Sequence, residues 1–467
     1  MSLELLGIVG ALLVLLPQVL VYFVHSAMLL VGKEERPKPR KPGNSKNISF
    51  IVPVRKEPLN YIEEAVKYVG SLGVANYEVI VVSDDDEQLK EELFGLINRL
   101  RNEGFNVWII WRSVPRGLRT GALNFGLYAS IGDFIYVLDV DSRPEKCFFV
   151  NAIEVLEGCR DCIGATGRWE PLNADSRVSE ALALGLKFLA RVLYRARDRV
   201  GLFVYPLGTG TLYKSRLLKE VLGGWDESKI QDDMEIGTRI MYSGFRVAYI
   251  DECAIYVENP SSYRAFRIQQ SRWAYGAMDV AMSNIKYIFR SRHPLLVRIE
   301  AYLYLLQYLP QSLVFIGTTM MCISQLICPA DSLKDLILLA ILWIAGLSSY
   351  SILMIREAFS GKRLWDFIVL AGRLSAFSTT VSPYVAFYSV KALLRFKETY
   401  QRTPKGIYQK IHSSTRFPWE LVLGVLITAV GLRAFFAESV ITALWLISMG
   451  SAYLYTTYRC TQDVFYD

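Results

Sequence analysis

The hydrophobic positions along the chain follow two patterns, which divide it into a membrane part and a water-exposed part. Residues 5–30 form an almost uncharged apolar run. At about 1.5 Å per residue, such a run can cross roughly 30 Å of hydrocarbon as a helix. A cleaved signal peptide begins with basic residues, whereas here Glu4 precedes the run and the basic residues follow it. Residues 1–32 are therefore predicted to form one transmembrane helix.

The next stretch, residues 33–47, reads as a linker. It carries six basic and two acidic residues between Lys33 and Lys46, interrupted by Pro37, Pro39, Pro42 and Gly43. Lys and Arg beside a membrane span are retained on the cytoplasmic side. The linker is therefore predicted to be cytoplasmic, with the N-terminus of the chain outside.

Short β-branched apolar runs then alternate with stretches of helical period. Strands are predicted at 48–54, 78–83, 105–111 and 134–139, and helices at 59–72 and 90–101. This alternation builds a mostly parallel sheet covered by helices on both faces, with ligands at the carboxyl ends of the strands. The predicted fold class is an α/β domain over residues 48–295, joined to an all-α membrane domain over 296–467.

Apolar spans return beyond Trp273. Four are predicted near 301–327, 336–355, 421–436 and 439–455, the last two as a hairpin. The stretch 366–392 has basic residues on both flanks and contains Arg373 and Pro383. Both residues are costly at a bilayer centre, so this stretch is predicted to be interfacial or re-entrant.

These spans give a topology. With five crossings, the basic loop 393–418, the α/β domain and the C-terminus all lie in the cytoplasm, and the protein is a multi-pass protein of the cell membrane. Composition agrees, because 52% hydrophobic residues with only 21% charged ones exclude an ordinary soluble globule. The net charge of +7 is too modest to indicate nucleic-acid binding.

Histidine and cysteine offer little metal chemistry. The three histidines are isolated in sequence, and the seven cysteines are scattered apart from the Cys159-x-x-Cys162 pair. The cysteines are interpreted as reduced thiols, with a local Cys159–Cys162 disulfide as the alternative. A catalytic metal would then need oxygen ligands, which points to a hard cation such as Mg²⁺ or Mn²⁺.

Acidic residues gather at three places where the predicted elements end or begin. Asp139 and Asp141 follow the fourth strand, and being one residue apart on an extended chain they can face one cation. Asp84, Asp85 and Asp86 follow the second strand, and Asp232 and Asp233 begin a helix. Each group also has an interpretation without a function. Asp139 and Asp141 would then be a solvated strand end, Asp84 to Asp86 an Asx turn, and Asp232 and Asp233 a helix cap.

Gln269-Gln270-Ser271-Arg272-Trp273 precedes the membrane part. An Arg beside a Trp can bind a phosphate while the indole stacks on a sugar, although a Trp at a membrane interface is an equal alternative.

Together these motifs resemble the membrane-embedded members of glycosyltransferase family 2, the group of cellulose, chitin and hyaluronan synthases. The resemblance rests on a series of motifs in a fixed order: Pro53, Glu57, Asp84, Arg119 with Gly121-Ala122-Leu123-Asn124, Asp139-x-Asp141, Asp232-Asp233, Gln269-x-x-Arg272-Trp273 and Thr403-Pro404-Lys405. A chance match to all of them in this order is far less probable than a match to any single one. The fold that it implies is a glycosyltransferase A-type domain that binds a nucleotide sugar.

The resemblance also implies residue roles. The nucleotide-sugar-binding residues are Pro53, Glu57, Asp84, Asp85, Arg119, Asn124, Asp139, Gln269, Arg272, Thr403 and Lys405. Asp139 and Asp141 would hold Mg²⁺ or Mn²⁺, and Asp233 would be the general base, with Asp232 as its catalytic partner. Trp273, Gly208 and Asp232 would bind the acceptor.

The expected activity is inverting, metal-dependent transfer of sugar from a nucleotide sugar, with a UDP-sugar as the expected donor, to a growing polysaccharide. The enzyme is expected to be processive and to export the product through its own helices. Tyr302, Tyr304, Gln307, Tyr308, Gln311 and Ser312 would line the path, opened by Pro310, with ordinary helix packing as the alternative.

Two other functions are kept as alternatives. One is transfer of a single sugar to a polyprenyl phosphate or another lipid acceptor, and the other is a transporter with a nucleotide-sensing domain. The expected partners are the donor, a glycan or lipid-linked acceptor and the bilayer, without nucleic acid, and the sequence identifies no partner subunit.

Overall fold

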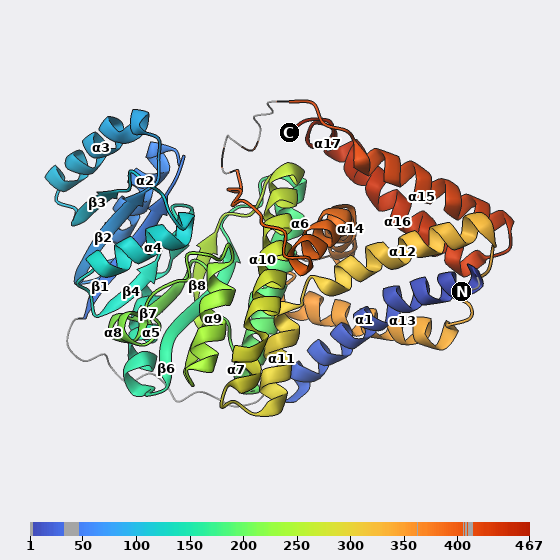
Figure 1. The fold of residues 1–467 in the computed structure, drawn as a ribbon, viewed down its shortest axis with the longest axis horizontal. Helices are drawn as coiled ribbons and strands as arrows, with labels where there is room; N and C mark the ends of the chain where they lie inside the picture. Colours follow the sequence, from blue (N-terminus) through green and yellow to red (C-terminus); the bar gives the residue numbers. More distant parts are fainter. Residues whose placement is uncertain (1–2, 32–45, 362, 405, 407–408, 410–413) are drawn as a thin grey trace.

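The computed structural model describes residues 3–31, 46–361, 363–404, 406, 409 and 414–467. Figure 1 shows an α/β domain at one end of the molecule, a bundle of long apolar helices at the other, and helices α6, α10 and α14 between them.

The α/β domain is built on one mixed sheet in the order β3-β2-β1-β4-β7-β6-β8-β5. The strands are β1 Asn47–Val54, β2 Asn76–Ser83, β3 Val107–Trp111, β4 Phe134–Val137, β5 Ser142–Pro144, β6 Cys162–Pro171, β7 Thr211–Lys214 and β8 Arg246–Val257. Strands β3, β2, β1 and β4 are parallel, whereas β7 pairs antiparallel with both β4 and β6. The four predicted strands and the mostly parallel sheet are therefore confirmed.

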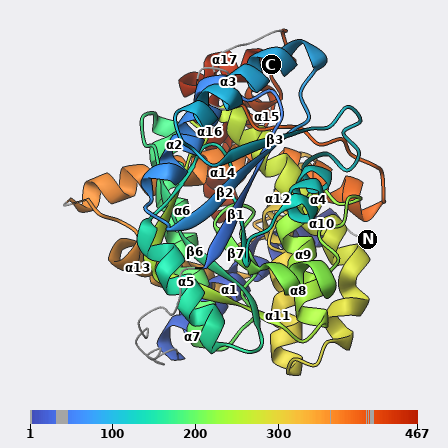
Figure 2. The same ribbon diagram turned by 90° about the vertical axis from the view of Figure 1, so that its left-hand side faces the viewer.

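Helices cover both faces of this sheet, as Figure 2 shows. Side chains alternate along a strand, so Phe50 and Val52 of β1 face one core while Ile51 between them faces the other. The first core is covered by α2 Leu59–Ser71, α3 Lys90–Asn102 and α5 Lys146–Gly158. The second is covered by α4 Leu118–Ala129, α8 Ser215–Glu220, α9 Asp232–Tyr242 and part of α10.

A layer of helices joins the sheet to the bundle. Its members are α6 Arg177–Phe188, the π-helical turn η2 Leu189–Tyr194, α7 Arg195–Arg199, α10 Tyr263–Arg290, α11 Leu295–Leu305 and α14 Leu364–Leu393. Val178 of α6, Phe266 of α10 and Phe377 of α14 belong to one shared core. These helices therefore fix the position of the α/β domain relative to the bundle.

Five helices of the described residues are long and apolar enough to cross a membrane. They span Glu4–Met28 in α1 Leu3–Val31, α12 Leu309–Ile327, α13 Ile337–Glu357, α15 Trp419–Phe436 and α16 Val440–Arg459, the last followed by the short α17 Thr461–Phe465. Helix α14 is not among them. Its Arg373 donates to Glu180 of α6 at 2.8 Å, and its interfacial or re-entrant position stays a prediction.

The sequence-based span 301–327 is wrong at its start. The chain leaves helical geometry at Leu306–Tyr308, so α11 and α12 are separate helices, and Pro310 lies in the first turn of α12. Proline is favoured in the first turn of a helix because the N–H groups of that turn have no intrahelical acceptor, so the N–H that proline lacks is not missed.

The interpretation of all cysteines as reduced thiols is also wrong. Cys147 is bonded to Cys253, because α5 packs against β8 and brings together residues 106 positions apart. Cys159 is bonded to Cys162, the alternative that the sequence offered. Cys322, Cys328 and Cys460 are free.

Helices α1 and α12 approach closely through glycines. A Cβ atom on Gly10 would lie 2.7 Å from the carbonyl oxygen of Gly317, and one on Gly317 would meet the Gly10 carbonyl and Val14. Small residues permit such close backbone contact between apolar helices.

We therefore predict that Gly317→Leu destabilises the protein by about 1–3 kcal/mol, since the added side chain forces the two helices apart. Thermal unfolding of the full chain in detergent measures this. Gly372→Ala on α14 is the control, because a Cβ there meets nothing within 4 Å; equal unfolding temperatures for the two variants would contradict the prediction.

Candidate active site

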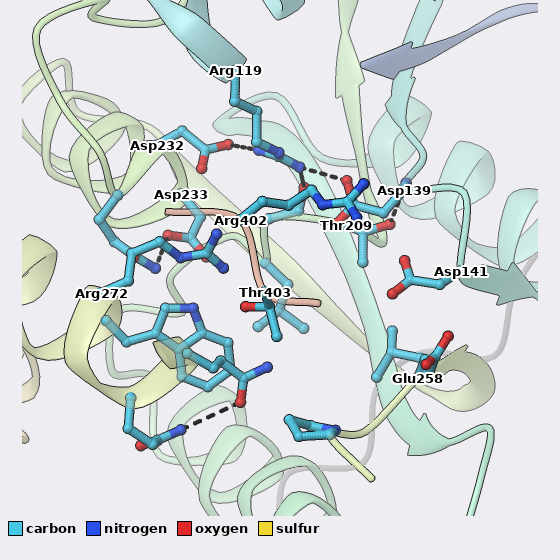
Figure 3. A pocket seen from close by; sticks show the side chains of 18 of the residues that line it. Arg119, Asp139, Asp141, Thr209, Asp232, Asp233, Glu258, Arg272, Arg402 and Thr403 are labelled. Carbon is cyan, nitrogen blue, oxygen red and sulfur yellow. Dashed lines mark hydrogen bonds and ion pairs between the residues drawn. The ribbon is translucent and has the colours of Figure 1, made fainter. Parts of the chain in front are cut away.

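A cavity of about 680 Å³ opens where the carboxyl ends of β1, β2 and β4 meet helices α6, α9, α10, α12 and α14. It continues from the acidic strand ends to the aromatic residues at the junction of α11 and α12. Figure 3 draws 18 of its lining residues and labels ten of them, with Asp139 and Asp141 on one side and Arg272 on the other.

Asp139 and Asp141 lie just beyond β4. The Asp139 N–H donates to the Thr209 hydroxyl at 3.2 Å, which fixes the turn, and its side chain is 30% exposed. The sheet order places this turn next to the end of β1. Two adjacent carboxylates at an accessible strand end are the oxygen donors that Mg²⁺ and Mn²⁺ prefer, so these residues fit such an ion.

Arg119 of α4 links this end of the cavity to the start of α9. One guanidinium nitrogen, Nη2, donates to Asp139 at 2.9 Å and to the carbonyl oxygen of Gly208 at 2.7 Å, while Nη1 is ion-paired with Asp232. Burial disfavours a charge, but the two carboxylates outweigh it and raise the pKa of Arg119. Arg119 therefore remains charged and holds Asp139 and Asp232 on either side of the cavity.

Asp232 and Asp233 begin α9, where Gln231 ends the preceding loop. The Oδ1 atom of Asp233 accepts from Gln231 Nε2 and from the Met234 N–H, both at 2.8 Å. Its Oδ2 atom faces Gly208, at which a Cβ would lie 3.4 Å away. Burial first, and then the charge of Asp232, raise the pKa of Asp233 to about 6. A carboxylate with a pKa near neutrality is suited to accept a proton.

The ends of β1 and β2 form a second corner of the cavity, which holds a buried ion pair. Asp84 lies beyond β2, and both of its oxygens accept from Arg112, at 2.6 Å from Nε and 2.5 Å from Nη2. Arg112 also donates to the carbonyl oxygens of Arg116 and Leu118. These bonds fix the chain between β3 and α4, and thus the position of Arg119.

Helix α10 supplies Gln269, Arg272 and Trp273, all of which line the cavity. The Arg272 guanidinium lies 4.9 Å from the Tyr400 ring centre and donates to the Gln401 carbonyl at 3.3 Å. The segment after α14 thus lies across the cavity, with Arg402 and Thr403 in its lining.

The far end of the cavity is aromatic. Tyr304 stacks on Tyr205 at 4.9 Å and lies 3.8 Å from the guanidinium of Arg197, and its hydroxyl is 2.9 Å from that of Tyr194. Of the six residues expected to line a sugar path, Tyr304, Gln307, Tyr308 and Gln311 do line the cavity. Tyr302 and Ser312 are not in its lining, and Ser312 instead bonds to Tyr308 and Ser389.

Most of the predicted site residues thus converge. Pro53, Glu57, Asp84, Arg119, Asp139, Asp141, Gly208, Asp232, Asp233, Gln269, Arg272, Trp273 and Thr403 line the one cavity. Lys405 lies outside the described residues. The roles of these side chains remain predictions.

Two expectations need correction. Asn124 does not line the cavity; its amide is buried, donates to the Trp225 carbonyl and accepts from the Trp225 N–H, because its helical turn packs against that loop. Asp85 accepts from the Lys56 N–H and the Ser83 hydroxyl, so it stabilises the turn after β1 and is not in the lining.

Three residues in or beside the cavity escaped prediction: Glu258 and Arg402 line it, and Arg112 holds the lining residue Asp84. Arg112 could have been found, because Trp111 and Ser83 are paired in the parallel register and the following residues, Arg112 and Asp84, must then be neighbours. Glu258 follows β8 and accepts from the Gly406 N–H at 3.1 Å. Arg402 binds Glu57 at 3.2 Å. For the last two, the sequence holds no local signal.

The mixed sheet, with a cavity at the carboxyl ends of its parallel strands, has the architecture of a glycosyltransferase A-type domain. A model described as "Glycosyl transferase family group 2" matches residues 134–456, and one described as "Glycosyl transferase family 2" matches residues 49–212. The chain therefore belongs to glycosyltransferase family 2.

Named relatives agree with this assignment. A probable glycosyltransferase of Sulfolobus acidocaldarius is 30% identical over 94% of this chain and 96% of its own length. Glucomannan 4-beta-mannosyltransferase 7 of Arabidopsis thaliana is 27% identical over 47% of this chain, which covers only 40% of that relative. The mannosyltransferase PcManGT of Pyrobaculum calidifontis, solved with GDP-Man and Mn²⁺, superimposes with a TM-score of 0.57 at 17% identity, over 85% of this chain and all of that one. It shares the fold.

For the base, we predict that Asp233→Asn lowers the rate of sugar transfer by about 10²- to 10⁴-fold, because the amide cannot accept the proton of the acceptor. Nucleotide affinity should change little. Transfer and nucleotide binding are measured on the purified full chain, with the exposed Glu220→Gln as control. Unchanged transfer would show that another group accepts the proton.

The raised pKa of Asp233 predicts a pH profile. The base acts only when deprotonated, so transfer should be fully active above its pKa, half-maximal near pH 6 and about tenfold lower for each pH unit below that. Turnover at saturating donor between pH 4.5 and 8 measures this. A rate that stays flat down to pH 5 would contradict the assignment.

Proposed function

We propose that this protein is an inverting, metal-dependent glycosyltransferase of the cell membrane that extends a glycan from a nucleotide sugar. The observation that carries the proposal is that one cavity contains the acidic strand ends, Asp233 and an aromatic arm. The aromatic arm is the far end of the cavity, lined by Tyr304, Gln307, Tyr308 and Gln311.

The reaction exchanges one bond to the anomeric carbon for another. The bond from that carbon to the diphosphate breaks, a bond to the acceptor oxygen forms, and the acceptor proton passes to Asp233. Asp139 and Asp141 would hold the divalent ion, which when bound neutralises the charge that grows on the diphosphate. Arg272 lies on the other side of the same cavity and would bind the diphosphate. Direct displacement assisted by one base inverts the anomeric carbon.

The acceptor would occupy the aromatic arm. Trp273, Tyr304 and Tyr308 offer flat faces for sugar rings, while Gln307 and Gln311 offer amide groups for hydroxyls. This lining favours a saccharide as the acceptor.

Leu182, Leu186 and Leu374 form part of the same lining, which is the observation in favour of the alternative, a lipid-linked acceptor. The Gln311 amide donates to the Ser378 carbonyl at 2.6 Å, which ties α12 to α14. Export of a product between these helices would require this contact to open.

The proposed membrane placement is supported by the five apolar helices and the basic flanks. The α/β domain and the C-terminus would face the cytoplasm and the N-terminus the outside. Donor nucleotides are made in the cytoplasm, so this orientation gives the cavity access to them.

The decisive experiment incubates membranes containing the protein with labelled nucleotide sugars and Mn²⁺ or Mg²⁺, and then measures the length of the product. We expect long water-soluble chains, whose formation stops when a chelator removes the ion.

Other outcomes are distinguishable. One sugar in the organic phase would support the lipid-linked acceptor instead. Nucleotide binding without any transfer would contradict a catalytic function and favour a nucleotide-sensing role. The Asp233→Asn variant is the matched control, because it retains the membrane helices and the nucleotide site.

A further inference from the structure

The loop after β1 and Arg402 form a corner that is rich in hydrogen-bond acceptors. The Nη1 atom of Arg402 donates to the carbonyl oxygen of Arg55 at 3.0 Å and to that of Lys56, and it lies 3.2 Å from Glu57 Oε2. The Glu57 side chain is only 7% exposed. Three oxygens from three successive residues thus face one planar group with N–H donors.

The backbone of this corner is held in an unusual conformation. Lys56 has a φ of 56°, in the left-handed region that a side chain disfavours. The Lys56 N–H donates to Asp85, whose other oxygen accepts from the Ser83 hydroxyl. Strain maintained by a dedicated hydrogen bond is typical of functional sites.

The position of the corner matches that of a nucleoside base. Asp139 lies beyond β4, and β1 and β2 are the next two strands of the sheet. Neighbouring strands are about 4.8 Å apart, so a nucleotide whose diphosphate lies beyond β4 reaches the ends of β1 and β2 after roughly 10 Å. Asp84, the other acid in this corner, has both oxygens bound to Arg112. Glu57 and the two carbonyl oxygens are therefore the acceptors placed to recognise the base.

From this arrangement, and resting on the proposed function, we propose that the donor is a guanine nucleotide and that Glu57 with the carbonyls of Arg55 and Lys56 selects it. The N1, C2 and N2 atoms of guanine form a guanidine unit, with N–H donors on both N1 and N2. The guanidinium of Arg402 has the same planar arrangement of donors and occupies the acceptor corner in its place.

Uracil fits this corner poorly. It presents a single ring N–H flanked by two carbonyl oxygens, so it can satisfy only one acceptor of the corner and places its own oxygens against the others. Leaving the buried Glu57 carboxylate without an N–H partner is costly, and a site built for N–H donors rejects a ligand that offers too few of them. This selection contrasts with the UDP-sugar expected from the sequence.

Nucleoside diphosphate binding to the purified full chain in detergent with Mn²⁺ tests the proposal. GDP should bind at least about tenfold more tightly than UDP. Inosine diphosphate, which lacks only the 2-amino group of guanine, should lose most of that advantage. Equal affinities for GDP and inosine diphosphate, or tighter binding of UDP than of GDP, would overturn the proposal.

Variants separate the base contact from other effects. Glu57→Gln should weaken GDP binding about tenfold and leave UDP binding unchanged, because the amide offers a donor where guanine needs an acceptor. Arg402→Ala should tighten GDP binding about threefold or more, since the competing guanidinium is gone. Lys397→Ala, an exposed cation of the same segment, is the control. Weaker GDP binding by Arg402→Ala would overturn the competition between the two groups.

The result also separates this proposal from the proposed function. Transfer from a UDP-sugar without any from a guanine nucleotide sugar would disprove the base selection and leave the glycosyltransferase intact. Failure to bind any nucleoside diphosphate would disprove both. Equal unfolding temperatures for the parent protein and Glu57→Gln exclude misfolding as the cause of weaker binding.

Discussion

The ion pairs of Arg119 are the interaction on which the active site depends. Asp139, Asp232 and Asp233 are like charges that line one cavity, and their mutual repulsion grows as water is excluded. Arg119 bonds two of the three and also the carbonyl of Gly208, so one side chain neutralises the acids and fixes the distance between the strand end and α9. Removal of Arg119 would leave the buried Asp232 carboxylate without this cationic partner, which costs more than the pair itself contributes.

The contacts of Arg119 also distinguish two acids that are neighbours in the sequence, Asp232 and Asp233. Asp232 is held by Arg119, whereas Asp233 is held by the weaker neutral donors Gln231 and Met234. Burial raises the pKa of both. Among the described residues, Asp232 is paired with the cation Arg119, whereas Asp233 accepts from neutral donors and has an oxygen facing Gly208. In the proposed mechanism, the difference between a charge-holding residue and a proton acceptor thus arises from their partners, since both are aspartates at the start of one helix.

The sequence predicted the sheet well, because buried parallel strands are continuous β-branched runs whose ends carry the ligands. It predicted which acids converge, since strand ends meet at one edge of a sheet. It could not predict side-chain direction on helices: Asn124 belongs to the matching motif, yet its amide holds the loop at Trp225. The Cys147–Cys253 bond and the break at Leu306–Tyr308 also depend on tertiary packing between elements far apart in the chain. Arg402 lies 345 residues after Glu57, so only the folded chain could bring the two together.

The contact between Arg402 and the loop after β1 has a consequence for donor binding. A donor whose base enters this corner must displace a guanidinium that already bonds two carbonyl oxygens and Glu57. The measured affinity therefore equals the intrinsic affinity multiplied by the fraction of molecules in which the corner is open. Displacing Arg402 lowers the affinity for every donor by the same factor. Only a donor whose base remakes the hydrogen bonds that Arg402 gives up recovers that affinity. Arg402 belongs to the same segment as Tyr400 and Gln401, which contact Arg272. The corner after β1 and the diphosphate contact proposed for Arg272 therefore depend on one stretch of chain, which links recognition of the base to contact with the leaving group.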